Sequence, residues 1–209
     1  MIPFQLTIEE CEYLVKLARR SVTEYLTCEE FLEIPKDVPT RLMELCGVFV
    51  TLNSLSDRGR MLRGCIGFPY PTKPLVEALI RAAVSAAVED FRFPVVKSDE
   101  LERIIFEVSV LTPPTLVQVE KPTDYPSKIK VGRDGLIVER GYKKGLLLPQ
   151  VPVELEWSTE EFLCQTAMKA GLTPDAWLLE GTKIHRFSSI IAHELTPNGK
   201  IEAKDMRKH

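Results

Sequence analysis

The segment LRGCIG, residues 62–67, combines residue types from which a reactive site can be built. If the segment forms a strand, its side chains alternate between two faces, so Arg63, Cys65 and Gly67 share one face. A guanidinium beside a thiol stabilises the thiolate and lowers its pKa, which would make Cys65 a nucleophile or a redox-sensitive group. Gly64 and Gly67 lack a Cβ and would let an anionic ligand approach backbone N–H groups.

The same segment also has a purely structural interpretation. Cys65 can act as a small buried apolar residue, the glycines can let a helix pack closely on the strand, and Arg63 can pair with an acid. An unpaired intracellular cysteine is more often buried than reactive, which favours this interpretation for the thiol.

A second candidate cluster lies in EDFRFPVV, residues 89–96. Asp90 could orient Arg92 towards a substrate, or act as a general acid or base. Arginine–carboxylate pairs are common structural contacts, so a salt-bridge cluster at the end of a helix is the favoured alternative. The two clusters supply the candidate catalytic residues Cys65, Arg63 and Asp90 and the candidate ligand-binding residues Gly64, Gly67 and Arg92.

Several other chemistries lack their sequence signatures. The three histidines, His185, His193 and His209, show no metal-ligand spacing, and the five cysteines contain no Cys-x-x-Cys pair. Phosphate-binding loops and Gly-x-Ser-x-Gly elbows are also absent. We therefore predict no metal site and assign no cofactor.

The overall composition is that of an ordinary globular protein. The 209 residues are 44% hydrophobic and carry a net charge of −3, which gives no general attraction to nucleic acids or anionic membranes. An odd number of cysteines without pair spacing fits a reducing compartment, so we expect a cytoplasmic protein. The apolar runs are too short to span a bilayer, so no membrane segment is expected.

Helical and strand patterns interleave along the chain. Thr7 and Glu10 form a capping box that predicts a helix over residues 7–25. The further expected elements are strands at 46–54 and 62–67 joined by a turn at 56–60, an alanine-rich helix after Pro74, a strand at 101–111, a meander of two or three strands over 129–150, a helix from Ser158, a strand at 183–195, and a frayed polar tail over 196–209. The irregular alternation favours an α+β protein with a mixed, mainly antiparallel sheet and two lobes. We expect the chain to pass from one lobe to the other at the proline-rich segments 35–39 and 113–126.

Six motifs together carry a family resemblance. They occur in the order LRGCIG, AAVSAAVEDFRFPVV, FEVSVLTPP, VGRDGLIVERG, LLLPQVPVE and FLCQTAMKAGLTPDAW. This order resembles that of the AMMECR domain family over residues 13–187. Arg63 to Gly67 match its signature hexapeptide, and Asp90, Arg92 and Phe93 match its second motif. One departure is Ala167, where relatives often carry a cysteine, so a paired-thiol mechanism at that position is disfavoured.

The resemblance implies one AMMECR-type domain over residues 1–209, with a larger lobe that holds both chain ends and a smaller inserted lobe. It implies no established activity. By association, it points to Memo-type proteins and radical S-adenosylmethionine proteins as partners, while a nucleic acid is not expected.

Two functional hypotheses follow. In the first, a cleft lined by Arg63, Cys65, Asp90 and Arg92 binds or modifies a small anionic substrate. In the second, the same glycine-rich surface is a non-enzymatic module that docks a partner protein or RNA. The residue pattern does not decide whether the protein is an enzyme.

Overall fold

The computed structural model describes residues 4–56 and 59–208 and divides the chain into two compact units. The first unit takes in the chain up to Pro113 together with Ile190–Lys204, and the second takes in Pro114–Ser189 and the chain from Asp205 onward. The first boundary lies between two prolines that end a strand, inside the predicted segment 113–126. The other predicted place for a change of lobe, residues 35–39, lies within the first unit.

The first unit contains a five-stranded sheet and two long helices. Its elements are α1 (Ile8–Cys28), β1 (Gly47–Ser56), β2 (Gly59–Phe68), α2 (Leu75–Val88), β3 (Ile104–Leu111), β8 (Ser189–Glu194) and β9 (Ile201–Asp205), with 3-10 turns at Thr40–Met43 and Ser98–Arg103. The strand order is β2-β1-β3-β8-β9, and β1 pairs antiparallel with both of its neighbours. Residues 57 and 58 of the predicted hairpin turn lie outside the described residues.

Helix α1 begins as its capping box predicts. The Glu10 backbone N–H donates to the Thr7 hydroxyl at 3.2 Å, and the Thr7 backbone N–H donates to the Glu10 carboxylate at 2.8 Å. The helix runs to Cys28, three residues past the predicted end, and stops where Glu29 adopts a left-handed conformation with φ 59°. Its buried stripe runs from Cys11 to Val22 and packs in the core of the first unit.

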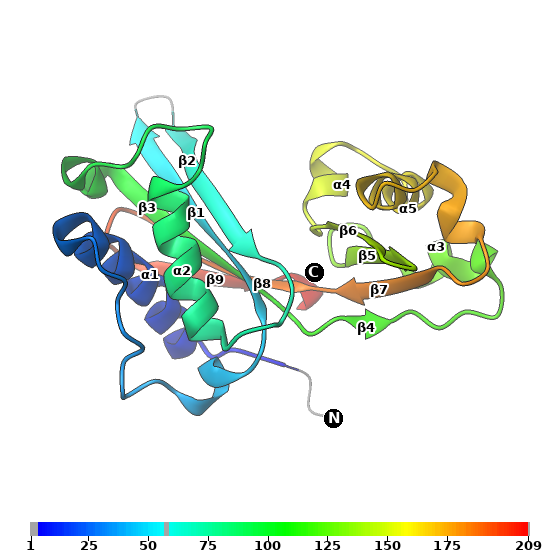
Figure 1. Ribbon diagram of the computed structural model, residues 1–209, viewed down its shortest axis with the longest axis horizontal. Helices are drawn as coiled ribbons and strands as arrows, with labels where there is room; N and C mark the ends of the chain where they lie inside the picture. The colour runs from blue at the N-terminus through cyan, green and yellow to red at the C-terminus, as the bar shows by residue number, and fades with distance from the viewer. Residues whose placement is uncertain (1–3, 57–58, 209) are drawn as a thin grey trace. The chain divides into compact units, whose positions relative to one another are not determined.

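Both helices cover the same face of this sheet, as Figure 1 shows. Side chains alternate along each strand, so one face of β1 and β3 is fully buried against α1 and α2. That covered face carries Val48, Val50, Leu52, Ile104, Phe106, Val108 and Val110. The other face, here called the open face because α1 and α2 do not cover it, carries the remaining alternate residues, which include Thr51 and Glu107. Thr51 and Glu107 are half-buried there, whereas Ile105, Ser109 and Leu111 of β3 are buried on this face as well.

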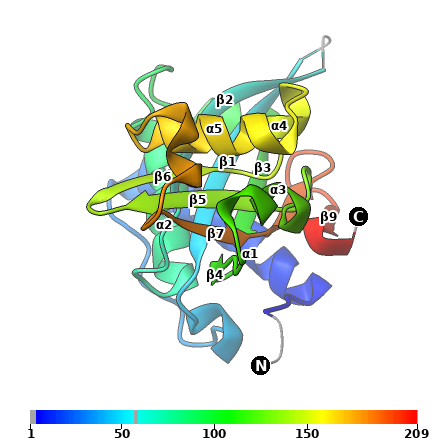
Figure 2. The same ribbon diagram turned by 90° about the vertical axis from the view of Figure 1, so that its right-hand side faces the viewer.

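The second unit has its own sheet and its own apolar core. Its elements are β4 (Thr115–Leu116), α3 (Tyr125–Lys128), β5 (Gly135–Arg140), β6 (Lys143–Leu147), α4 (Val151–Glu154), α5 (Thr159–Lys169) and β7 (Lys183–Phe187), with 3-10 turns at Pro122–Asp124 and Pro174–Leu178. The strand order is β4-β7-β5-β6, all antiparallel. Figure 2 shows α5 lying across β5 and β6, and Phe162 and Leu163 of this helix are buried in the core beneath it.

The C-terminal segment departs from the expected frayed tail. Residues Ile201–Asp205 form β9, which pairs with β8, and Ile201 packs in the first core. The pair Asn198–Gly199, a hairpin-turn signature, makes the connection, and Asn198 has a φ of 55°. The prediction of a flexible tail over 196–209 is therefore wrong for the strand. The residues from Asp205 onward group with the second unit.

The predicted fold class is confirmed. The chain is a mixed α+β protein whose sheets are packed with helices, and the pairings β1–β2, β1–β3, β4–β7, β5–β6 and β5–β7 are antiparallel. No helix within residues 4–56 and 59–208 combines the length and the apolar character needed to cross a membrane.

Candidate functional site

The signature segment lies on β2, at one edge of the first sheet. In the pairing with β1, Leu52 faces Gly64 and Asn53 faces Leu62, so Arg63 is an extra residue without a partner. Such a β-bulge changes the direction of the side chains around it. The simple alternation that placed Arg63 beside Cys65 therefore does not hold at this point.

The bulge residue Arg63 is bound to acid and backbone partners. Its Nε and Nη2 donate to the two oxygens of Glu100 at 2.8 and 2.9 Å, and its Nη1 donates to the Pro94 carbonyl at 2.8 Å. This two-point contact holds the pKa of Glu100 below its ordinary value. Among the described residues, none of the interactions of Arg63 reaches Cys65. Arg63 thus behaves as the structural alternative predicts.

The two sequence clusters meet through the backbone of Cys65. The Cys65 N–H donates to Asp90 Oδ2 at 2.8 Å, and Arg92 Nη2 donates to the Cys65 carbonyl at 3.2 Å. Arg92 also binds both oxygens of Asp90, at 2.9 Å from Nε and 2.7 Å from Nη2. We call this arrangement of Asp90 and Arg92 the backbone clamp. It occupies the outward-facing groups of an edge strand, which are otherwise open to pairing.

The hydrogen bonds of the clamp stabilise the ionised form of the Asp90 carboxyl. The Asp90 residue is 5% exposed, and the Arg92 guanidinium, followed by the N–H groups of Cys65 and Arg92, holds the pKa of its carboxyl well below the usual range despite burial. The Arg92 side chain is 46% exposed. A buried carboxylate therefore fixes a half-exposed cation beside the signature cysteine.

The thiol of Cys65 is half-buried on the open face of the sheet. Because the clamp occupies its N–H and C=O, Cys65 forms a non-hydrogen-bonded pair with Thr51, in which side chains stand closest. The Thr51 hydroxyl donates to Cys65 Sγ at 3.2 Å. Burial raises the pKa of the thiol, and the hydroxyl and the Arg92 charge only partly offset this effect. The thiol is therefore protonated at neutral pH, in contrast to the predicted activation by Arg63.

Two further residues belong to this site, although neither is among the predicted catalytic or ligand-binding residues. Thr51 faces Cys65 on one side and Glu107 on the other, so the three side chains form one row across β2, β1 and β3. Burial raises the pKa of Glu107, against the opposing effects of His193 and Arg60. The sequence does carry a signal, because Glu107 is the single charged residue of the apolar strand IIFEVSVL.

The two candidate glycines serve close packing. A Cβ on Gly64 would lie 2.1 Å from the Ala86 carbonyl oxygen of α2, and one on Gly67 would lie 2.2 Å from the Phe49 ring. The prediction that glycines let the alanine-rich helix approach the strand therefore describes Gly64 well. Protein atoms occupy the space at both positions.

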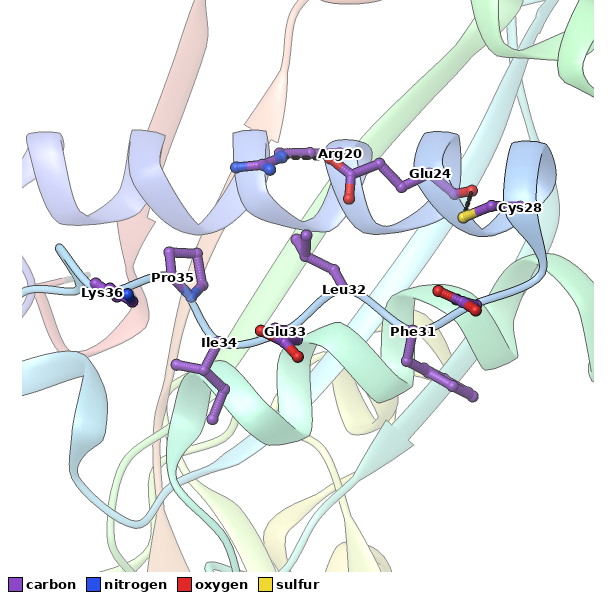
Figure 3. A pocket seen from close by; sticks show the side chains of 10 residues that line it. Arg20, Glu24, Cys28, Phe31, Leu32, Glu33, Ile34, Pro35 and Lys36 are labelled. Atoms are coloured by element: carbon purple, nitrogen blue, oxygen red, sulfur yellow. Dashed lines mark hydrogen bonds and ion pairs between the residues drawn. The ribbon is translucent and has the colours of Figure 1, made fainter.

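A groove of about 460 Å³ lies elsewhere in the first unit, between the C-terminal half of α1 and residues 30–36. Figure 3 shows Arg20, Glu24 and Cys28 on its helical side. None of the candidate site residues lines this groove. In the part of the chain that the structure describes, no three His, Cys, Asp or Glu side chains are grouped as metal ligands, and the predicted lack of a metal stays a prediction.

Fold and site together define a class of protein: a two-unit antiparallel α+β protein whose edge strand carries a cysteine held by an aspartate–arginine clamp. The AMMECR1 family model matches residues 15–192. The chain belongs to the AMMECR1 family, as its signature motifs predict.

Similar proteins and a similar structure come from archaea. The chain is 54% identical over 204 residues to Protein PH0010 of Pyrococcus horikoshii, covering 97% of this chain and 98% of that protein. It is 56% identical over 196 residues to Protein TK0174 of Thermococcus kodakarensis, covering 93% of this chain and 95% of the relative. The crystal structure of PH0010, described there as an uncharacterized protein, matches with a TM-score of 0.82 at 55% identity, over 94% of this chain and 97% of that chain.

Proposed function

We propose that this protein binds a small anionic ligand on the open face of the first sheet, beside Cys65. The observation that carries the proposal is the half-exposed Arg92, which Asp90 holds against the carbonyl of Cys65. Arg63 takes no part, because Glu100 and Pro94 already use its donors.

One nitrogen of the Arg92 guanidinium is available to bind a ligand. Its Nε and Nη2 serve the clamp, whereas Nη1 donates to no atom of the described residues. A guanidinium with a free nitrogen can bind a carboxylate or phosphate oxygen, although the Asp90 charge weakens the attraction. Arg60 and His193 add positive or ionisable groups near Glu107 on the same sheet. Thr51 and Cys65 supply further hydrogen-bonding groups.

The geometry favours binding over catalysis as the starting hypothesis. Burial keeps the thiol protonated, so Cys65 is not a ready nucleophile in this state. A cytoplasmic location remains part of the proposal, and its support is the composition of the sequence, with five cysteines that lack pair spacing.

Charged and neutral alkylating probes test the proposal directly. If Arg92 attracts anions, iodoacetate should react with Cys65 faster, relative to iodoacetamide, than it does with the free thiol N-acetylcysteinamide. We expect the normalised rate ratio to be about 3- to 10-fold higher at Cys65, and the preference to fall as salt is added. Peptide mass spectrometry separates Cys65 from the other four cysteines.

The matched variants are Arg92→Gln and Arg103→Gln, the second at an exposed arginine of a 3-10 turn. The first should abolish the preference for iodoacetate, and the second should leave it unchanged. A ratio at Cys65 equal to that of the free thiol, with no effect of Arg92→Gln, would contradict anion binding at this site.

A protein-docking role is the second candidate, and one exposed aromatic residue favours it. Phe91 is 95% exposed and lies between Asp90 and Arg92, the residues of the clamp. Val95 follows in the same segment and is 56% exposed. Exposed aromatic side chains next to a rigid backbone are typical anchors of protein interfaces. The partners that the family resemblance implies are a Memo-type protein and a radical S-adenosylmethionine protein.

Replacement of Phe91 by alanine should weaken binding to such a purified partner by about tenfold or more. Isothermal titration calorimetry measures the affinity. Tyr142→Ala is the control, because Tyr142 is equally exposed, at 95%, but lies in the β5–β6 turn of the second unit. The docking role is wrong if neither partner binds, or if both variants change the affinity alike.

A further inference from the structure

Glu107 is an ionisable group outside the signature hexapeptide. It lies near the middle of β3, the central strand of the sheet. Cys65 lies two strands away on β2, and Thr51 of β1 lies between them. All three side chains lie on the open face, because the alternate residues of β1 and β3 face the helices. No hydrogen bond to the Glu107 carboxylate is found among the described residues, although the side chain is half-buried.

Charged and ionisable groups lie near this row on the neighbouring strands and in the segment after α2. His193 of β8 and Arg60 of β2 act on Glu107, while Arg92, Asp90 and Glu107 act on Cys65. Arg92 favours the thiolate, and the two carboxylates oppose it. Asp90 is locked in the clamp with Arg92, so Glu107 is the carboxylate whose charge a ligand can change.

We propose that Glu107 is a positioning residue of the Cys65 site, whose negative charge adds to the effect of burial in disfavouring the thiolate until a ligand group neutralises it. This inference rests on the proposed function, because it assumes that the ligand lies on the open face. A ligand that carries a cationic or hydrogen-bond-donating group beside its anionic group would contact Glu107 and Arg92 at once. The class of ligand is then zwitterionic, and its binding makes Cys65 more reactive.

The expected size of the effect follows from the strand spacing. Two strand separations place the two side chains about 10 Å apart. At that distance and an effective dielectric constant of about 20 to 40, one unit charge changes a protonation equilibrium by a factor of roughly 4 to 16. Partial exposure and salt reduce this factor, so we expect about 3- to 10-fold.

The pH dependence of Cys65 alkylation by neutral iodoacetamide tests the inference. Glu107→Gln removes the charge and should move the midpoint of the profile to lower pH, raising the rate at pH 7 about 3- to 10-fold. Glu107→Asp keeps the charge and should retain a profile close to that of the unchanged protein. Glu102→Gln, at an exposed position just before β3, should have no effect.

The outcomes separate this inference from the proposed function. An unchanged midpoint in Glu107→Gln, in a protein whose circular dichroism and melting temperature are preserved, overturns the role of Glu107. Equal shifts in Glu107→Gln and Glu107→Asp also overturn it, because a packing change and not the charge would then be responsible. The anion preference of Cys65 is a separate measurement with charged probes, and it can fail or succeed independently.

Discussion

Replacement of Arg19 by methionine is expected to lower the free energy of unfolding by about 3 to 5 kcal/mol. Arg19 of α1 donates from Nε and Nη2 to the two oxygens of Glu194, at 2.6 and 2.5 Å. The Glu194 residue is only 2% exposed, so its charge has no water to replace a lost partner. A buried carboxylate left without its arginine is the costly feature of this variant.

Arg19 also satisfies the backbone near the start of β3. Its Nη1 donates to the Leu101 carbonyl at 3.1 Å, its Nη2 donates to the Ile104 carbonyl at 2.6 Å, and the guanidinium lies 4.5 Å from the centre of the Phe106 ring. Glu194 in turn accepts from the Phe106 N–H at 3.0 Å. The pair therefore joins α1, β3 and β8, and its loss loosens all three elements.

Chemical denaturation at pH 7 measures the effect, with two reference variants. Arg20→Met removes an exposed arginine that pairs with Glu24, and it should change stability by less than about 1 kcal/mol. The double variant Arg19→Met/Glu194→Gln should lose less than Arg19→Met alone, because the glutamine is uncharged and still accepts from the Phe106 N–H. If Arg19→Met costs no more than Arg20→Met, the buried pair is not a major stabilising contact.

Replacement of Asp90 by alanine should cost about 2 to 4 kcal/mol at pH 7. The variant removes the acceptor of the Cys65 N–H, of the Arg92 backbone N–H and of Arg92 Nε and Nη2, and it frees one edge of the sheet. Asp99→Ala, at an exposed aspartate in the Ser98–Arg103 turn, is the control and should change stability by less than about 0.5 kcal/mol.

The cost of Asp90→Ala should depend on pH in one direction. The native pKa of Asp90 lies below its ordinary value of 3.8, so its stabilising effect is complete above that value and is lost as the pH falls through the native pKa. The difference between the unchanged protein and Asp90→Ala should therefore be largest at neutral pH and shrink below about pH 4. A difference that stays constant down to pH 3 would show that the ionised carboxylate does not stabilise the clamp.

Local sequence signals predict much of the fold. The Thr7–Glu10 capping box, the alanines after Pro74 and the proline pair at 113–114 predict a helix start, a closely packed helix and a strand end, and the structure has all three. These signals are local because a cap, a helix face and a strand stop involve residues within a few positions of one another. The polar composition of residues 196–209 favours a frayed tail, and this prediction is wrong for β9. The Asn198–Gly199 pair does predict the hairpin turn that precedes this strand.

The structure contains only some of the contacts that the sequence motifs predict for the site. The motifs point to Cys65, Asp90 and Arg92, which the structure joins through backbone and side-chain hydrogen bonds. The expected contact between Arg63 and Cys65 is absent from the described residues, because a bulge interrupts the alternation and Glu100 binds the guanidinium. A bulge depends on the register between two strands, which the sequence of one strand does not contain.

Residue order alone was enough to establish the family, the antiparallel α+β class and the two segments that carry the candidate site. The partners of each charged group were settled only in three dimensions. Glu194 meets Arg19 across 175 positions, and Glu107 shares a row with Cys65 through Thr51 because strand register places them there. The protonation of the thiol likewise depends on burial and on neighbouring charges, which arise only when distant segments pack together.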